Sequence, residues 1–261
     1  MDRLIRTDII DGVGVITLNR PDAFNALNIA FARELSASVH AVTEDPAVRA
    51  ILLKASGKHF CAGGDVKWFA GLGQGLGAGL DELIGILNPV AERLMNCPLP
   101  VVTAAKGIAA GAGVGFALSG DIVYAGESFK MLSSYSAIGL TPDLGAAYCL
   151  VRRVGLSRAK EFFFRNLPLD AKKCMEWGVI SAVFPDEAVD DEAFRLASDL
   201  AKGPTLALTF TKKLVDKSLY RELDEQLALE REFMSRCGRS DDGMEGVAAF
   251  VEKRNPKFTG K

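Results

Sequence analysis

Few residues of this 261-residue chain could do chemistry, and their types exclude several reaction classes. Only two histidines occur, His40 and His59, so we expect neither a histidine-based triad nor a histidine metal centre. The five cysteines are scattered without a C-x-x-C pair, which argues against a zinc site and a disulfide scaffold. The glycine-rich segment 71–79 matches no nucleotide-binding loop. The candidates that remain are carboxylates and the backbone of glycine-rich loops.

Two glycine-rich segments carry the main functional signal. They are 59–67, HFCAGGDVK, and 107–122, GIAAGAGVGFALSGDI. Further segments in the same order are 18–21 (LNRP), 25–27 (NAL), 138–143 (IGLTPD), 154–155 (VG) and 250–254 (FVEKR). Together these segments resemble the signatures of the crotonase superfamily, the enoyl-CoA hydratase/isomerase family. The resemblance covers nearly the whole chain at the family's spacing.

The resemblance implies an oxyanion hole built from the backbone N–H groups of Gly64 and Ala112. Chemistry beside a thioester carbonyl generates an enolate, and preorganised N–H donors stabilise its negative oxygen. One donor is expected in a tight loop and the other at the start of a helix, where amides are unpaired. Ala112 stands where the family often has glycine, a change that a backbone donor survives. The alternative is that both segments are ordinary tight turns.

Family hydratases use two glutamates to position and activate a water, and both are missing here. The first position matches Gly115, and no acid lies between residues 107 and 120. The second matches Tyr135, and no acid lies between residues 129 and 142. Asp143 remains, at a place where several family isomerases and a dehalogenase carry a catalytic aspartate. An apolar acyl pocket would raise its pKa, as a base working near neutral pH requires. The alternative is a turn or helix cap.

Other residues are expected around the substrate by the same resemblance. They are Ala62, Asp65, Val66, Lys67, Tyr135, Phe250 and Lys253. Asp65 is expected mainly to bond loop amides, and Tyr135 either lines the acyl pocket, bonds the thioester end or packs in the core. Lys67 and Lys253 are candidates for the CoA phosphates, with solvated lysines as the alternative. Phe250 either reaches a neighbouring subunit's ligand or is a core aromatic.

Strands and helices that alternate along the chain favour an α/β fold. The Asp11-Gly12 pair predicts a hairpin over 8–19, and apolar runs predict strands at 50–55, 101–105, 121–125 and 179–184. An apolar stripe predicts a helix over 25–43, and another helix is expected over 81–95. The composition of 71–79 predicts a mobile flap between them. From residue 190 onward only helices are expected, with breaks near 203–204 and 238.

The resemblance implies a crotonase-type spiral of ββα units with a C-terminal helical region. We expect residues 1–200 to form the spiral core with the acyl-CoA site. Residues 201–261 are expected to form a helical region involved in trimerisation, because the family forms trimers or paired trimers. The expected assembly is therefore a homotrimer or homohexamer.

Composition limits the partners and the setting. The chain has 31 basic and 33 acidic residues, a net charge of −2, which argues against nucleic acid or an anionic membrane as partner. The first ten residues hold no signal-peptide core and no run of about 18 apolar residues exists, so no membrane span is expected. Free cysteines then favour the cytoplasm. Coenzyme A enters as part of the substrate, and no separate cofactor is expected.

The expected function is a double-bond shift in an enoyl-CoA through a stabilised thioester enolate. A single carboxylate can take a proton from one carbon and return it to another, whereas hydration must also activate a water. The alternatives are an enoyl-CoA hydratase or another lyase or hydrolase of the family, and a non-catalytic acyl-CoA binder.

Overall fold

The computed structural model describes residues 3–261, and its main sheet is mixed. In spatial order its strands are β1 (Ile5–Ile10), β2 (Val13–Leu18), β3 (Ala50–Ala55), β4 (Val101–Ala105), β6 (Ile122–Gly126) and β9 (Ala182–Phe184). β1 and β2 form the predicted antiparallel hairpin, with Asp11 and Gly12 at positive φ in its turn. The remaining neighbours pair in parallel, as strands joined by crossovers do.

A second, three-stranded sheet was not predicted from the sequence. It contains β5 (Ile108–Ala110), β7 (Lys130–Leu132) and β8 (Leu169–Asp170). Strands of two or three residues are too short to produce a readable alternation of apolar and polar positions. β4 and β5 are followed by one helix, and β6 and β7 by the next, so the chain repeats ββα units as the resemblance implied.

Ten α-helices accompany the two sheets within residues 3–261. They are α1 (Ile29–Glu44), α2 (Val66–Leu72), α3 (Leu76–Asn96), α4 (Ala112–Leu118), α5 (Ala146–Arg165), α6 (Ala171–Glu176), α7 (Val189–Ala201), α8 (Thr205–Lys217), α9 (Leu223–Gly238) and α10 (Asp241–Glu252). α5 changes direction at Gly155, which has φ 77°.

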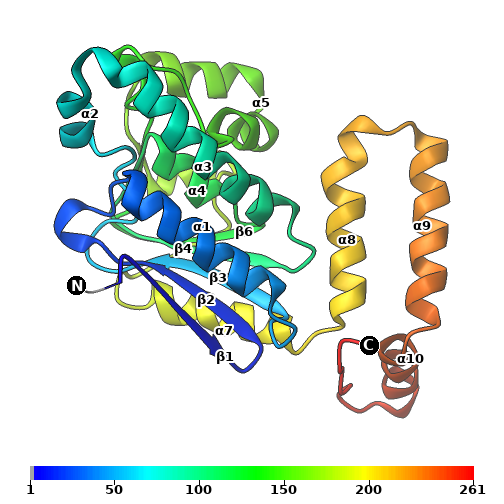
Figure 1. Ribbon diagram of the computed structural model, residues 1–261. Helices are drawn as coiled ribbons and strands as arrows, with labels where there is room; N and C mark the ends of the chain where they lie inside the picture. Colours follow the sequence, from blue (N-terminus) through cyan, green and yellow to red (C-terminus); the bar gives the residue numbers. More distant parts are fainter. Residues whose placement is uncertain (1–2) are drawn as a thin grey trace.

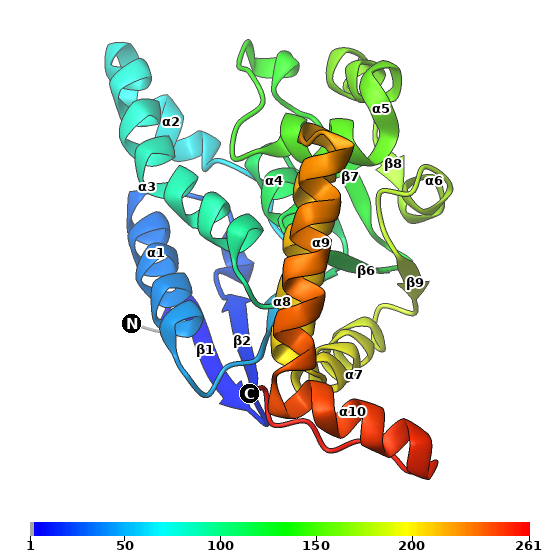
Figure 2. The ribbon, with the colours of Figure 1, turned by 90° about the vertical axis from the view of Figure 1, so that its right-hand side faces the viewer.

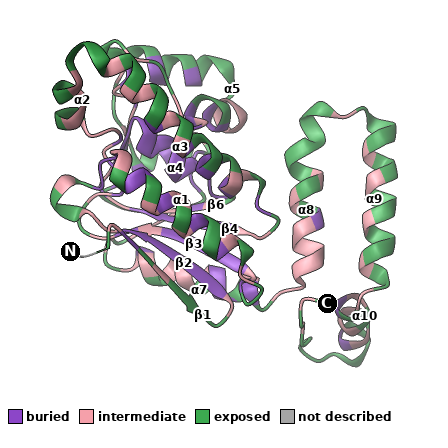
Figure 3. Cartoon of the chain, in the orientation of Figure 1, coloured by how far each residue is buried: buried purple, intermediate pink, exposed green. Residues whose placement is uncertain are grey.

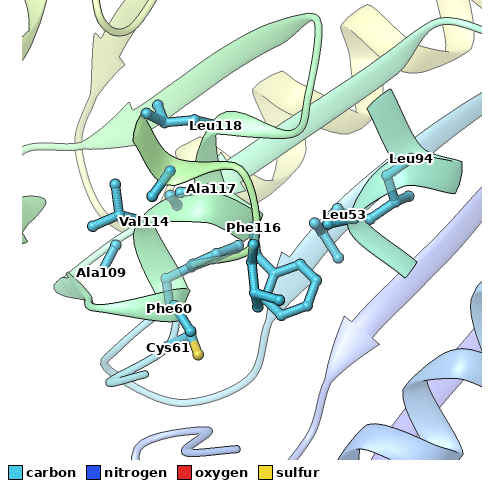
Figure 4. Packing of buried hydrophobic residues seen from close by; sticks show 14 of the residues in the cluster. Leu53, Phe60, Cys61, Leu94, Ala109, Val114, Phe116, Ala117 and Leu118 are labelled. Atoms are coloured by element: carbon cyan, nitrogen blue, oxygen red, sulfur yellow. The ribbon is translucent and has the colours of Figure 1, made fainter. Parts of the chain in front are cut away.

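Helices cover both faces of the main sheet (Figures 1 and 3). α1 and α3 lie over one face, and α7 covers the other, where Ala193 and Ala197 pack on Val15 and Leu52. All six residues of β2 are therefore buried, as expected for a strand with helices on both sides. The core continues at α4, where Phe116 of this helix and Phe60 belong to one cluster of buried residues (Figure 4).

Two helix starts differ from the sequence expectation. α1 begins at Ile29, because the Asn28 side chain caps it by accepting a hydrogen bond from the Phe31 N–H. The segment 71–79 is not a flap but the end of α2, a short 3₁₀ turn and the start of α3. Glycines disfavour helix, yet a Cβ on Gly79 would lie 2.4 Å from Leu72 Cδ1. The glycine at position 79 therefore leaves room for the Leu72 side chain where α2 and α3 meet.

The last three helices project from the sheet domain, with α9 outermost (Figures 1 and 2). Arg49 holds their base through hydrogen bonds to Thr205 Oγ1 at 2.9 Å and to the Gly203 carbonyl at 2.6 Å. Lys212 of α8 pairs with Asp121 at 2.8 Å, which ties α8 to the residue before β6. The expected breaks near 203–204 and 238 are present, but the break over 218–222 between α8 and α9 was not predicted. The division into residues 1–200 and 201–261 stays a prediction. Among the described residues, no helix is both long and apolar enough to cross a bilayer.

Candidate active site

A cavity of about 150 Å³ lies between the two glycine-rich segments and the helices α2 and α3. Its lining residues are Leu27, Ala62, Gly64, Val66, Phe69, Leu80, Leu83, Ile84, Leu87, Gly111, Ala112, Ser134, Tyr135, Ile138, Leu140, Thr141 and Asp143. Most of these side chains are apolar, and Asp143 is the one carboxylate among the described lining residues. An enclosed apolar cavity with a few convergent polar groups is the usual form of a small-molecule site.

The loop before α2 presents the Gly64 N–H to this cavity. The Gly63 carbonyl accepts from the Leu27 N–H, and the Asp65 N–H donates to the Leu27 carbonyl, as in a parallel bridge. Gly64 lies between these two residues, so its N–H points away from Leu27. Within residues 3–261 this N–H has no hydrogen-bond partner. Gly64 also has no room for a side chain, because a Cβ would lie 2.2 Å from the Phe69 ring.

The second glycine-rich segment presents the N–H of Ala112. Ala112 is the first residue of α4, a position whose N–H has no partner inside the helix, and none is present elsewhere in the described chain. A bridge between Cys61 and Ala109 joins the two segments. A Cβ on Gly63 would lie 2.6 Å from the Ala110 carbonyl oxygen and 3.3 Å from Ala112 N. The two unpaired amides thus lie on neighbouring backbone segments and line the same cavity.

Asp143 is buried beside Tyr135 at the same cavity. The Tyr135 hydroxyl donates to Asp143 Oδ1 at 2.5 Å and accepts from the Asp143 N–H at 3.3 Å. Burial raises the pKa of Asp143 above its usual value, although the tyrosine hydrogen bond opposes this. The helix-cap alternative is wrong, since α5 is preceded by Gly145 without any side-chain cap.

The position of the first hydratase glutamate has no space for a side chain. A Cβ on Gly115 would lie 2.6 Å from the Leu144 carbonyl oxygen and 3.0 Å from Leu144 Cβ. Leu144 itself has φ 44°, a conformation that a leucine rarely adopts. The backbone that follows Asp143 therefore fills the volume that a larger residue at position 115 would need.

Asp65 supports the loop rather than lining the cavity. It caps α2 by accepting from the Trp68 N–H at 3.3 Å and forms an ion pair with Arg20 at 2.8 Å. Burial alone would raise the pKa of Asp65, but the hydrogen bonds from Arg20 and the first amides of α2 outweigh it and hold the pKa below its usual value. Asp65 therefore has a structural role, but the amides that it bonds belong to the first turn of α2 rather than to the loop.

Cys61 is a buried thiol on the inner side of the same loop. It is inaccessible to solvent, and its Sγ donates to the Asn25 carbonyl at 3.2 Å. Burial raises the pKa of Cys61 to about 12, so it stays a thiol at neutral pH and is no nucleophile.

The other expected substrate residues divide into two groups. Ala62 and Val66 line the cavity, together with Tyr135. Lys67 is exposed in the first turn of α2 and does not line it. Phe250 lies on the projecting α10 and Lys253 directly follows it, both outside the cavity lining of their own chain. Phe250 is 86% exposed, so it is not a core aromatic.

Two groups of site residues escaped the sequence analysis. Leu80, Leu83, Ile84 and Leu87 form one cavity wall on α3, and their three- and four-residue spacing is a helical signal that could have revealed them. Asn25 is fully buried and donates to the Ser56 and His59 carbonyls, which ties the chain before Leu27 to the loop that carries Gly64.

Comparisons with known proteins agree with this fold. The family model described as enoyl-CoA hydratase/isomerase matches residues 8–261. The chain is 38% identical to the 1,2-epoxyphenylacetyl-CoA isomerase of Escherichia coli K12 over the whole of both chains. It is 39% identical to a protein of Rhodobacter capsulatus named "Probable enoyl-CoA hydratase", with 98% of each chain covered. The crystal structure of an enoyl-CoA hydratase from Polaromonas sp. JS666 superposes with a TM-score of 0.92 at 29% identity, covering 98% of this chain and 99% of that one.

The spiral of ββα units and the whole-length sequence match define the class as a crotonase-type α/β protein. The chain belongs to the enoyl-CoA hydratase/isomerase family.

Proposed function

We propose that this protein is an enoyl-CoA isomerase that shifts a carbon–carbon double bond of an acyl-CoA thioester. The observation that carries the proposal is the single carboxylate, Asp143, among the described residues that line the cavity. One carboxylate can move a proton between two carbons of a substrate, whereas hydration also requires a water to be positioned and activated.

In the proposed reaction the thioester oxygen accepts hydrogen bonds from the N–H groups of Gly64 and Ala112. Asp143 takes a proton from the substrate's α-carbon, and the electron pair of the broken C–H bond passes into a dienolate whose charge is carried by the thioester oxygen. The two N–H donors stabilise that charge. Asp143 then returns the proton to the γ-carbon, so the double bond moves from β,γ to α,β and the carboxylate is restored.

An enoyl-CoA hydratase is the second candidate, because a relative with 39% identity carries that name. The residues of the site favour hydration less than isomerisation. A hydratase of this family needs two carboxylates, but Gly115 is packed against Leu144 and Tyr135 occupies the other position. Another lyase or hydrolase of the family, or a non-catalytic acyl-CoA binder, would share the same oxyanion hole.

The cavity suggests the kind of acyl group that the site would take. A volume of about 150 Å³ lined by apolar side chains holds roughly one benzene-sized group. We therefore propose a compact apolar acyl moiety, with coenzyme A as part of the substrate and Lys67 near its phosphates. The E. coli relative is named for a substrate whose acyl group carries an epoxidised six-membered ring, which agrees with this size.

A panel of enoyl-CoA esters incubated with the enzyme in D₂O tests the proposal. The panel contains short, long and aromatic acyl groups, and mass spectrometry follows each ester. An isomerase moves the double bond without net addition of water, which chromatography against the authentic α,β-enoyl ester detects, and deuterium enters wherever the proton on Asp143 exchanges with solvent before its return. Addition of water would replace the proposal by a hydratase, and tight binding with neither a double-bond shift nor addition of water would replace it by a binder.

We further propose that the protein assembles as a homotrimer or homohexamer through its projecting helices. Their exposed apolar residues, each more than half exposed, are Val215, Leu219, Tyr220, Leu223, Leu227, Met234, Met244, Val247, Phe250 and Val251. An apolar surface of this extent is typical of an interaction site. In such an assembly Phe250 and Lys253 would reach a neighbouring subunit's ligand.

Sedimentation velocity should detect three or six chains per particle. Phe250→Asp places a charge in the apolar surface and should shift the particle toward monomer, and deletion from Gly238 onward should weaken CoA binding or break the assembly. A wild-type monomer with normal CoA affinity would contradict the proposed assembly.

A further inference from the structure

Tyr135 lies between two polar groups of the same aspartate. Its side chain is 6% exposed, and it directly precedes the 3₁₀ turn Ser136–Ile138. The hydroxyl oxygen accepts the Asp143 N–H at 3.3 Å and donates to Asp143 Oδ1 at 2.5 Å. Because the backbone N–H occupies the acceptor side of the hydroxyl, the phenolic proton is directed at the carboxylate. The aspartate is thus tied to its own backbone through the tyrosine.

No other described residue bonds the Asp143 carboxyl group. Oδ1 has the tyrosine as its partner, and Oδ2 has no hydrogen bond within residues 3–261. The cavity-lining residues of α2, α3 and α4 are apolar. Two titratable groups lie near Asp143: Tyr135, which acts on its pKa, and the Cys61 thiol, whose own pKa the Asp143 charge raises. Among these two, only Tyr135 contacts the carboxylate.

We infer that Tyr135 is a positioning residue for the proton transfer, which holds Oδ1 and leaves Oδ2 free to exchange a proton with the substrate. This inference rests on the proposed function, in which Asp143 is the base. It assigns different roles to the two carboxylate oxygens. Tyr135 stands at the second hydratase position, where a hydratase has a glutamate. In this protein the residue at that position would orient the carboxylate of Asp143 instead of supplying a carboxylate itself.

Electrostatics give the tyrosine a second effect. Burial raises the pKa of Asp143, and the hydrogen bond from Tyr135 lowers it. Burial, followed by the nearby carboxylate charge, raises the pKa of Tyr135 itself, so the phenol stays protonated and remains a donor at every working pH. The tyrosine therefore keeps the base ionised at a lower pH than burial alone would allow.

Replacing Tyr135 by Phe tests the inference, because it removes the hydroxyl and keeps the ring. The ascending limb of the kcat/KM–pH profile should move to higher pH by about one unit. This is the change in the pKa of Asp143 expected when a hydrogen bond to its charged form is lost. At pH values below this limb, the kcat/KM of the variant should be about tenfold lower than that of wild type. On the high-pH plateau, where Asp143 is ionised in both proteins, the loss should be smaller. A residue that only fills space would leave the limb in place.

Tyr124→Phe is the matched control. Tyr124 lies on β6 against Phe184, outside the cavity lining, so its replacement should leave the profile unchanged.

Replacing all four tyrosines by 3-fluorotyrosine should shift the limb in the opposite direction. A more acidic phenol is a stronger donor, so the limb should move to lower pH, and this shift should vanish in the Tyr135→Phe protein.

An infrared titration of the substrate-free enzyme separates this inference from the proposed function. The carboxylic-acid band of Asp143, identified by its loss in Asp143→Asn, should titrate at higher pH in Tyr135→Phe than in wild type. This measurement needs no turnover, so it remains decisive even if the ester panel shows no isomerase. An Asp143 band that titrates at the same or a lower pH in Tyr135→Phe would overturn the positioning role.

Discussion

Asp143→Asn should lower isomerase turnover by at least about 100-fold, the usual contribution of a positioned general base. The substitution keeps the size of the side chain, and its remaining oxygen can still accept the hydrogen bond from Tyr135. The geometry of the cavity is therefore retained while the proton acceptor is lost. Affinity for a substrate analogue, measured by calorimetry, should change little because the two N–H donors are untouched.

The pH profile adds a second criterion for Asp143. Burial raises its pKa, so the wild-type rate should rise with pH through a single carboxylate above the ordinary range for aspartate. This limb should be absent from the residual activity of Asp143→Asn. Near-normal turnover by a well-folded variant would remove Asp143 as the base.

The same pKa shift has a consequence for stability. Because its pKa is raised, Asp143 holds its proton more tightly in the folded state than in the unfolded state. The stability contributed by this group is therefore complete below the ordinary aspartate pKa and is lost as pH rises through the raised pKa. Asp143→Asn lacks this dependence. Its free energy of unfolding relative to wild type should therefore increase between acidic and neutral pH, which chemical denaturation at two pH values measures.

Local patterns predicted the parts of the fold that local chemistry determines. The Asp11-Gly12 turn, the buried strand over 50–55 and the apolar stripe of α1 all occur where the residues indicated. The cap of α6 is a local feature of the same kind, because the Asp170 side chain accepts from the Lys173 N–H three residues later. These features depend on residues within a few positions of one another.

Features that depend on distant contacts could not be predicted in the same way. The helical backbone over 71–79 brings Gly79 against the Leu72 side chain, and a glycine-rich composition gives no sign of this contact. The cavity wall on α3 is apolar like any core face, and only its position opposite Ala112 makes it part of a site. The hydrogen bond between Tyr135 and Asp143 requires the turn over 136–138.

Ala112→Pro should lower turnover by about 100- to 1,000-fold, the range measured for the loss of one oxyanion donor. Ala112 is the first residue of α4, where proline is well tolerated. The preceding Gly111, at φ 52° and ψ −126°, is already outside the helical region that a following proline disfavours. The variant should therefore fold, as circular dichroism and sedimentation would verify, while lacking one N–H at the cavity.

Asp241→Pro is the matched control for this substitution. It places proline at the first position of α10, after an extended Ser240 and outside the cavity lining, so turnover should remain near wild type. Full activity in a folded Ala112→Pro protein would show that the amide at position 112 does not stabilise the enolate.

The double variant that combines Ala112→Pro with Asp143→Asn tests whether the two groups act together. If the base and the donor act on the same proton-transfer step, the loss in the double variant should be smaller than the product of the two single losses, because groups that act as a unit are non-additive.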